Sequence, residues 1–310
     1  MKLIPKSLDI SHIGDIITHE STTSEVRITD GFLLAGTVML ASLNSAILHG
    51  TPFSEKGKVF GFNFLCSCVW TLILILLGGR LSLSAQTLFF GVLYAAVQIV
   101  FLVFKSKAMS LGPISLTTLI GNMSLLLSTV CGVVFWHENC GVFQIFGIAL
   151  LVAATVICTY KKDTLTFGKG WSFYVVGFFV SAAGIGLVFK AFSKSGGNTG
   201  DMMLTAAVIM TIITGAITFA NRSLFKSMVS DRRFLLTSAA CGVVSCLYNR
   251  INIYLSGAID SVIFFPTFNG GVIILSTIIG TVVFKERLSV RQKAGILTGV
   301  AAIIIIGVLK

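Results

Sequence analysis

The sequence predicts an all-α integral membrane protein with ten transmembrane helices, arranged as two inverted repeats of five helices. Two observations predict this fold class. First, 55% of the 310 residues are hydrophobic and only 11% are charged, whereas a soluble domain carries about 25% charged residues. Second, the stretch 128–147 recurs 148 positions later with eight identities and no gap. Such internal repetition must be settled before the other elements are assigned, because missing it misassigns the whole fold.

The two copies of the repeat share the same order of elements. Each has an apolar helix, a tight polar turn with a glutamate, and a second apolar helix that begins with Gln-x-x-Gly. The turn and the second helix carry Glu138, Gln144 and Gly147 in the first copy, and Glu286, Gln292 and Gly295 in the second. The other identities join Ser128, Thr129, Gly132, Val134 and Val142 to Ser276, Thr277, Gly280, Val282 and Val290.

The elements follow from apolar runs of about twenty residues, the length that crosses a bilayer. Residues 1–30 are a polar lead-in without the apolar core of a signal peptide. The predicted spans are 31–49, 60–79, 84–104, 113–136, 141–159, 171–190, 202–220, 234–256, 261–284 and 294–309. The first span carries Asn44, Ser45 and His49, and without it the chain would have nine spans.

These spans divide into two repeats, 31–160 and 171–309. Because five is odd, the second repeat starts on the opposite side of the membrane and is inverted. Inverted repeats are typical of transporters, with the substrate site near the midplane between the repeats. Two similar halves that exchange roles also provide alternating access.

The repeat resembles a known family at its last two helices. A fourth helix with Pro113, the turn Phe135-Trp136-His137-Glu138 and the following Gln-x-x-Gly are similar to an EamA repeat. The second copy, Val283 to Leu288 with its own Gln-x-x-Gly, is similar to the same pattern. The resemblance implies a ten-helix carrier of the drug/metabolite transporter superfamily, with both termini cytoplasmic. Such carriers move amino acids, other small metabolites or drugs.

Loop charges and the resemblance disagree on orientation. The N-terminus, the even loops and the C-terminus hold seven lysines and arginines, whereas the odd loops hold fifteen. The positive-inside rule therefore places the odd loops in the cytoplasm and both termini outside. The resemblance implies the reverse, and the orientation is left open. The net charge of +11 is assigned to loop anchoring and lipid head groups rather than to nucleic acid.

The acidic residues restrict the mechanism. All twelve lie in the lead-in, in the loops or at the ends of spans. A proton-coupled exporter of hydrophobic cations usually needs a carboxylate within a span, so this absence counts against a small-multidrug mechanism. Arg250 is the charge that lies well inside a predicted span. It either binds an anionic group in the cavity or reaches the head groups with its long side chain.

Further candidates for the cavity are polar residues within spans. They are Asn122, Asn269, Gln98 and Tyr248, and each amide serves either as a contact between helices or as a contact for substrate. Glu138 and Glu286 are expected to cap the helix that follows them. Gly295 and Gly299 permit a close helix contact, either within the chain or between protomers. The seven cysteines are interpreted as reduced packing residues.

The predicted function is transport of small organic metabolites, amino-acid-like or other solutes, with export as the expected direction. The alternatives are export of drug-like compounds on the same scaffold, and a non-transporting assembly or lipid-handling subunit. No enzyme motif, metal site, cofactor site or phosphate-binding loop is found in the sequence. The expected partners are a small-molecule substrate and the lipid bilayer, in a bacterial cytoplasmic membrane, as a monomer or homodimer.

Overall fold

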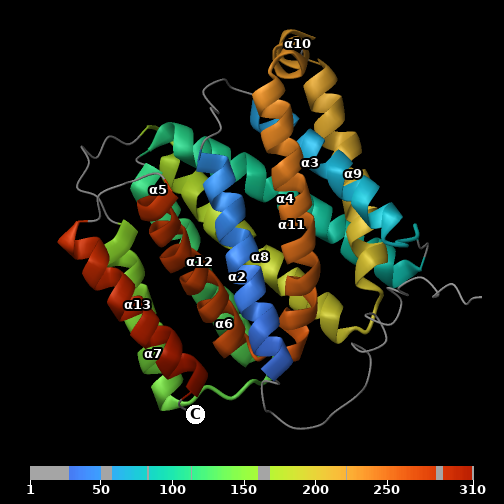
Figure 1. The fold of residues 1–310 in the computed structure, drawn as a ribbon. Helices are drawn as coiled ribbons and strands as arrows, with labels where there is room; N and C mark the ends of the chain where they lie inside the picture. Colours follow the sequence, from blue (N-terminus) through green and yellow to red (C-terminus); the bar gives the residue numbers. More distant parts are fainter. Residues whose placement is uncertain are drawn as a thin grey trace, which may run out of the picture.

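The computed structural model describes residues 28–49, 58–81, 84–112, 114–159, 168–220, 222–283 and 289–308. Every regular element within these ranges is an α-helix, and the helices form one bundle (Figure 1). The expected all-α membrane class agrees with this arrangement. In the first half the helices are α2 (Ile28–His49), α3 (Lys58–Leu76), α4 (Ala85–Leu111), α5 (Ile114–Asn122), α6 (Ser124–Trp136) and α7 (Val142–Thr159).

The second half repeats the same order with two differences. Its helices are α8 (Trp171–Lys194), α9 (Thr199–Ala220), α10 (Arg222–Ser230), α11 (Arg232–Ala258), α12 (Ser261–Val283) and α13 (Val290–Val308). The short helix α10 is added, and one helix, α12, is in the place of α5 and α6. The bundle therefore has two ends. We call the end where α2 begins and α13 ends the terminal side, and it also carries the loops 137–141, 195–198 and 259–260. The opposite end, where α10 lies, is called the basic side because Lys105, Lys107, Arg232 and Arg233 lie at that end of the described helices.

Several helices differ in length from the predicted spans. Helix α4 continues to Leu111 through the expected break at 105–107, and α8 continues beyond residue 190 to Lys194. The fourth span is two helices, because α5 ends at Asn122 and α6 begins at Ser124. The amide of Met123 between them bonds to the carbonyls of both Leu119 and Ile120, each at 3.1 Å. The expected loop 222–233 contains the short helix α10.

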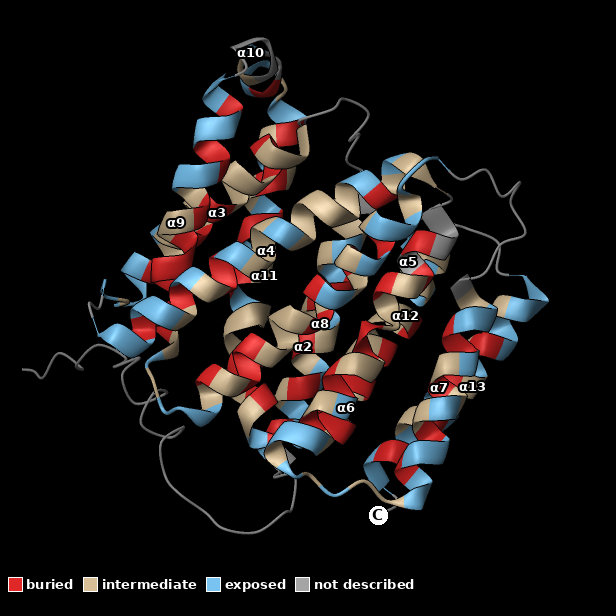
Figure 2. Ribbon diagram, turned by 180° about the vertical axis from the view of Figure 1, so that it is seen from behind, coloured by how far each residue is buried: buried red, intermediate tan, exposed pale blue. Residues whose placement is uncertain are grey.

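In the described ranges, nine stretches are long and apolar enough to cross a membrane, and the first of them is Thr29–Ile47. The remaining predicted span, 141–159, corresponds to α7, whose apolar part, Val142–Cys158, is shorter. Large apolar side chains are exposed on the outward faces of the bundle, whereas the buried residues face neighbouring helices (Figure 2). This distribution suits a chain surrounded by lipid, because the same exposed surface in water would favour aggregation.

The helices pack across the two halves. Helix α3 packs against α9, α6 against α12, and α7 against α13. In addition, α4 packs against α8 and α2 packs against α11. The largest buried apolar cluster includes Trp70, Tyr94, Phe189 and Phe192, and so joins α3, α4 and α8 with α9 and α11. The core of the bundle is therefore built from both halves together.

Glycines bring α7 and α13 into close contact at one edge of the bundle, where the two helices lie side by side (Figures 1 and 2). A Cβ atom on Gly295 would lie 2.5 Å from Sγ of Cys158 and 3.2 Å from the carbonyl of Ala154. A Cβ atom on Gly299 would lie 2.8 Å from Cδ1 of Ile274. Gly295 and Gly299 were expected to permit a close helix contact either within the chain or between protomers, and the described contacts support a contact within the chain. All seven cysteines are free thiols.

We expect Gly295→Ala to lower the free energy of unfolding by about 1 kcal/mol, since the added methyl group must displace Cys158. Denaturation in detergent micelles measures the change. Gly307→Ala is the control on the same helix, because a Cβ atom there meets nothing within 4 Å. It should stabilise α13 slightly, through the better helix propensity of alanine. Equal effects of the two variants would contradict the close packing of α7 on α13.

Candidate functional site

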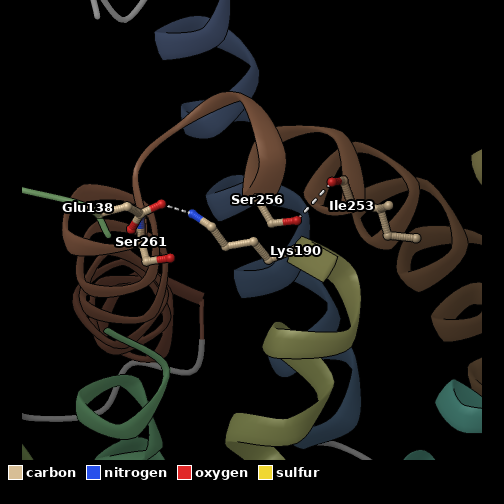
Figure 3. A network of polar contacts seen from close by, with 5 residues as sticks. All are labelled: Glu138, Lys190, Ile253, Ser256 and Ser261. Atoms are coloured by element: carbon tan, nitrogen blue, oxygen red, sulfur yellow. Dashed lines mark hydrogen bonds and ion pairs between the residues drawn. The ribbon is translucent and has the colours of Figure 1, made fainter. Parts of the chain in front are cut away.

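A buried ion pair joins the two halves near the terminal side. The ammonium group of Lys190 in α8 contacts Oε1 of Glu138, which lies in the loop between α6 and α7 (Figure 3). The side chain of Lys190 is 0% exposed and that of Glu138 is 7% exposed. Charged side chains are rarely buried to this degree unless they are paired, because removal from water costs several kcal/mol per ion. The pair is therefore the principal candidate for a functional element.

Local backbone structure directs Glu138 toward the second half. Helix α6 ends at Trp136, and His137 adopts the left-handed conformation with φ 53°. This conformation reverses the chain at a helix end. The second carboxylate oxygen of Glu138 then accepts a hydrogen bond from the backbone N–H of Ser261 at 2.6 Å. Ser261 is the first residue of α12, so the carboxylate occupies the positive end of that helix.

Two neighbours complete the surroundings of the pair. The ring of Trp136 lies 5.7 Å from Nζ of Lys190, which is within the range of a cation–π contact. Gly132 allows α6 to approach α12, because a Cβ atom there would overlap Cβ of Ser261 and lie 2.8 Å from Oε2 of Glu138. Near the lysine chain lies Ser256 of α11, whose hydroxyl donates to the carbonyl of Ile253 at 2.8 Å (Figure 3).

The role expected for Glu138 needs correction. The sequence predicts that Glu138 caps the next helix, α7, but its carboxylate bonds to Lys190 of α8 and to the amide of Ser261 at the start of α12. Lys190 is the last residue of the predicted span 171–190, so its place in the sequence did not single it out as a buried charge. The available signal was the recurrence of the glutamate together with a lysine enclosed by Phe189, Ala191 and Phe192. Glu286 lies outside the described residues.

The glutamines of the repeat, by contrast, are turn residues in both copies. Oε1 of Gln144 accepts a hydrogen bond from the amide of Gly141 at 2.9 Å. Oε1 of Gln292 accepts the equivalent bond from the amide of Ser289 at 3.0 Å, and Ser289 in turn accepts from the amide of Gln292 at 3.2 Å. This reciprocal arrangement is a capping box. Gly147, three residues after Gln144, packs on Ile306 of α13.

Arg250 lies near the terminal side rather than at the centre of the bundle. A Cβ atom on Gly200 would lie 3.8 Å from Nη2 of Arg250, so the guanidinium group is beside the first turn of α9. The residue is half-buried. Asp201 of the same turn accepts a hydrogen bond from the backbone amide of Arg80 at 2.8 Å. Arg250 therefore lies beside polar groups near the terminal side of the bundle.

The remaining candidates are all half-buried. Asn122 lies at the break between α5 and α6, and Asn269 donates to the carbonyl of Phe265 in its own helix at 2.9 Å. Gln98 in α4 has a buried Oε1 without a hydrogen-bond partner, and Tyr248 lies on α11. Within the described residues, no hydrogen bond joins any two of Arg250, Asn122, Asn269, Gln98 and Tyr248. The structure thus does not bring them together as one bonded cluster.

Several buried side-chain oxygens lack a hydrogen-bond partner within the described residues. They are inaccessible to solvent and belong to Asn44, Gln98, Thr129, Thr211, Asn252, Ser261 and Thr267. Buried polar groups are normally satisfied, so each such group needs an explanation such as an unseen water or a ligand. All seven are uncharged amide or hydroxyl groups, and they lie on α2, α4, α6, α9, α11 and α12.

Comparison with known proteins adds three findings. No protein-family profile matches the chain. The chain is 26% identical over 259 residues to "Putative sugar uptake protein lmo0176" of Listeria monocytogenes serovar 1/2a (strain ATCC BAA-679 / EGD-e), covering 81% of this chain and 78% of the relative. A protein of known crystal structure, described without a function, superposes with a TM-score of 0.72 and 13% identity. That superposition covers 90% of this chain and 96% of the other, and it supports the fold alone.

These findings place the protein in a broad class. The relative and the nine apolar stretches together support a multi-pass membrane transporter. A role without catalysis fits the same observations. The resemblance to EamA repeats, the inverted arrangement and the substrate remain predictions.

Proposed function

We propose that the protein is a carrier of small neutral solutes rich in hydroxyl groups, such as sugars, built from two inverted five-helix repeats in a bacterial cytoplasmic membrane. The observation that carries this proposal is the packing of helices across the halves. Second helices pair with each other (α3 and α9), as do fourth helices (α6 and α12) and fifth helices (α7 and α13). The third helix of each half pairs with the first of the other, α4 with α8 and α11 with α2.

This pattern is the one that a two-fold exchange of the halves requires. When the two halves are exchanged, the pairs α3–α9, α6–α12 and α7–α13 each map onto themselves. The pair α4–α8 maps onto the pair α11–α2. Because each half crosses the membrane an odd number of times, the axis lies in the membrane plane. Carriers built in this way bind substrate at the interface of the halves and open alternately to the two sides.

The choice of substrate class rests on the seven unpartnered buried oxygens. Hydroxyl and amide groups bind neutral polyols through paired hydrogen bonds, without a charge that would need compensation. The relative named as a sugar uptake protein favours the same class and favours uptake, whereas the sequence led us to expect export. We adopt uptake as the proposed direction. An amino-acid-like substrate is the alternative, and Arg250 is the group that would hold its carboxylate.

Transport of labelled solutes into proteoliposomes tests this proposal. We expect uptake of at least one neutral sugar, and competition by other sugars, with little uptake of amino acids. Gln98→Leu and Asn252→Leu should each reduce the ratio kcat/KM for that sugar by about tenfold or more, since a lost hydrogen bond in a dry site costs about 1.5 kcal/mol. The matched control is Thr298→Ala, a half-buried threonine of α13 whose hydroxyl donates to the carbonyl of Ala294 in its own helix.

The alternative predicts a different result. If Arg250 holds a carboxylate, Arg250→Ala should abolish transport of amino acids and organic acids. Transport of acids with no sugar uptake would replace the proposed substrate class with this one. Wild-type protein that moves no solute of either class would contradict the carrier itself.

A further inference from the structure

We propose that Glu138, Lys190 and the N–H of Ser261 form the gate that closes the terminal side, and that the empty carrier rests with this side closed. The proposal rests on the proposed carrier function and deepens it. Glu138 belongs to the first half, whereas Lys190 and Ser261 belong to the second. A rearrangement that separates the halves on the terminal side must therefore break both contacts of the carboxylate.

Other contacts at the same end support a closed terminal side. The backbone amide of Arg80 donates to Asp201 at 2.8 Å, and Nε2 of Gln86 donates to the carbonyl of Ser195 at 3.0 Å. The hydroxyl of Tyr254 donates to Oδ1 of Asp30 at 3.3 Å. Each of these three hydrogen bonds again joins the first half to the second.

Equivalent helices of the two halves also pack differently, and the closer pair meets near the terminal side. Helix α8 packs against α11, and Gly257 of α11 directly touches Ser193 of α8. The equivalent pair in the first half is α2 and α4, and their described residues make few contacts. Two halves of similar sequence thus hold different arrangements, as expected of a carrier that is closed on one side.

The repeat register explains why the terminal side is favoured. The shift of 148 positions also aligns α8 with α2, because Ala183, Gly184 and Ser193 match Ala35, Gly36 and Ser45. In this register Lys190 corresponds to Ser42, a buried serine whose hydroxyl donates to the carbonyl of Val272 at 3.5 Å.

The second partner of the glutamate is also missing from the first half. At the same shift Ser261 corresponds to Pro113, and proline has no backbone N–H. Glu138 itself corresponds to Glu286. The sequence thus retains the glutamate in both halves, but it supplies an ammonium group and a backbone N–H at the partner positions only for Glu138. An equivalent gate on the basic side would lack both donors.

Burial makes this difference large enough to set a resting state. Charge-assisted hydrogen bonds are about twice as strong as neutral ones, and the carboxylate makes two of them in a nearly dry environment. Opening the terminal side must replace both with water. A carrier with this buried, charge-assisted network on its terminal side populates the state in which that side is closed, until substrate binding or another input compensates.

Hydrogen–deuterium exchange of the full-length protein in lipid nanodiscs tests the gate without a transport assay. We expect Glu138→Gln and Lys190→Met each to accelerate exchange of the backbone amides of residues 255–262 by about tenfold or more. Each substitution removes the ion pair between Glu138 and Lys190, which helps to hold the terminal side closed. Lys194→Met is the matched control, an exposed lysine one turn further along the same helix, and its exchange should equal that of wild type.

A third variant, Ser261→Pro, tests the gate with a substitution that we expect the fold to tolerate. Ser261→Pro copies residue 113 of the first half, and proline is well tolerated at the first position of a helix. It removes the N–H donor while the ion pair is retained, so we expect a smaller acceleration, about threefold, in folded protein. The exchanged pair Glu138→Lys with Lys190→Glu should fail to restore slow exchange, because a lysine at position 138 would face the positive end of α12.

The outcomes separate the gate from the carrier. Unchanged exchange in Glu138→Gln, Lys190→Met and Ser261→Pro, with sugar transport by the wild-type protein, would overturn the gate and leave the carrier standing. Accelerated exchange together with a changed transport rate supports both. Accelerated exchange in a protein that transports no solute supports the closure of the terminal side and refutes the carrier.

Discussion

Replacing Lys190 with methionine is expected to lower the free energy of unfolding by about 3–5 kcal/mol, the cost of leaving one buried charge without its partner. The carboxylate of Glu138 would keep only the N–H of Ser261 in a site that is 7% exposed. Methionine has nearly the volume of the lysine stem, so the loss is electrostatic rather than steric. Reversible denaturation in mixed SDS micelles, followed by the fluorescence of the three tryptophans, measures it.

The double variant Lys190→Met with Glu138→Gln provides the control for this prediction. It removes both charges together, and it should recover a large part of the lost stability, since a buried ion pair is often replaceable by uncharged groups at little cost. A double-mutant cycle then gives the coupling between the two side chains. If the single and double variants were equally unstable, the two charges would not depend on each other.

This expectation also bears on why the pair is present. A buried ion pair contributes little net stability compared with well-packed apolar residues. Stability alone therefore gives no reason to place a lysine and a glutamate in the interior of an apolar bundle. A contact that forms in one state of a carrier and opens in the other does give a reason, because both charges become hydrated when the terminal side opens.

Composition and repetition predicted the membrane class well because both are properties of long stretches. Nine predicted spans correspond to stretches long enough to cross a membrane. The boundaries were less predictable, since helices of membrane proteins extend beyond the apolar core. Lys105 and Lys107 therefore lie within α4, although they read as a loop in the sequence. The break between α5 and α6 at Met123 has no proline at that position, and the weak helix formers Gly121 and Asn122 directly precede it.

In the candidate site, contacts within one turn were predictable from the sequence, whereas contacts between distant residues were not. Capping by Gln144 and Gln292 follows from spacing within one turn, so the repeat already indicated their structural role. The partners of Glu138 lie 52 and 123 positions away, and no local pattern contains them. Arg250 was selected because it is the charge that lies well inside a predicted span, whereas Lys190, four residues before the end of α8, is a charged residue that is 0% exposed.

The second large effect is expected at Gly132, which separates α6 from the start of α12. An added Cβ atom would overlap Cβ of Ser261 and lie 2.5 Å from its hydroxyl and 2.8 Å from Oε2 of Glu138. Gly132→Ala therefore pushes the two helices apart and weakens the bond between Glu138 and the amide of Ser261. Overpacking costs about 1–3 kcal/mol and a charge-assisted hydrogen bond about 1.5–3 kcal/mol, so we expect a loss of about 3 kcal/mol.

Gly36→Ala is the matched control for this substitution, because α2 leaves open space there and a Cβ atom meets nothing within 4 Å. It should stabilise the protein by about 0.5 kcal/mol through helix propensity. The same denaturation in micelles measures both variants. If Gly132→Ala were as stable as wild type, the close approach of α6 to α12 would be wrong. If it were unstable and also exchanged amides 255–262 faster, the small residue at position 132 would be required for the carboxylate to reach the second half.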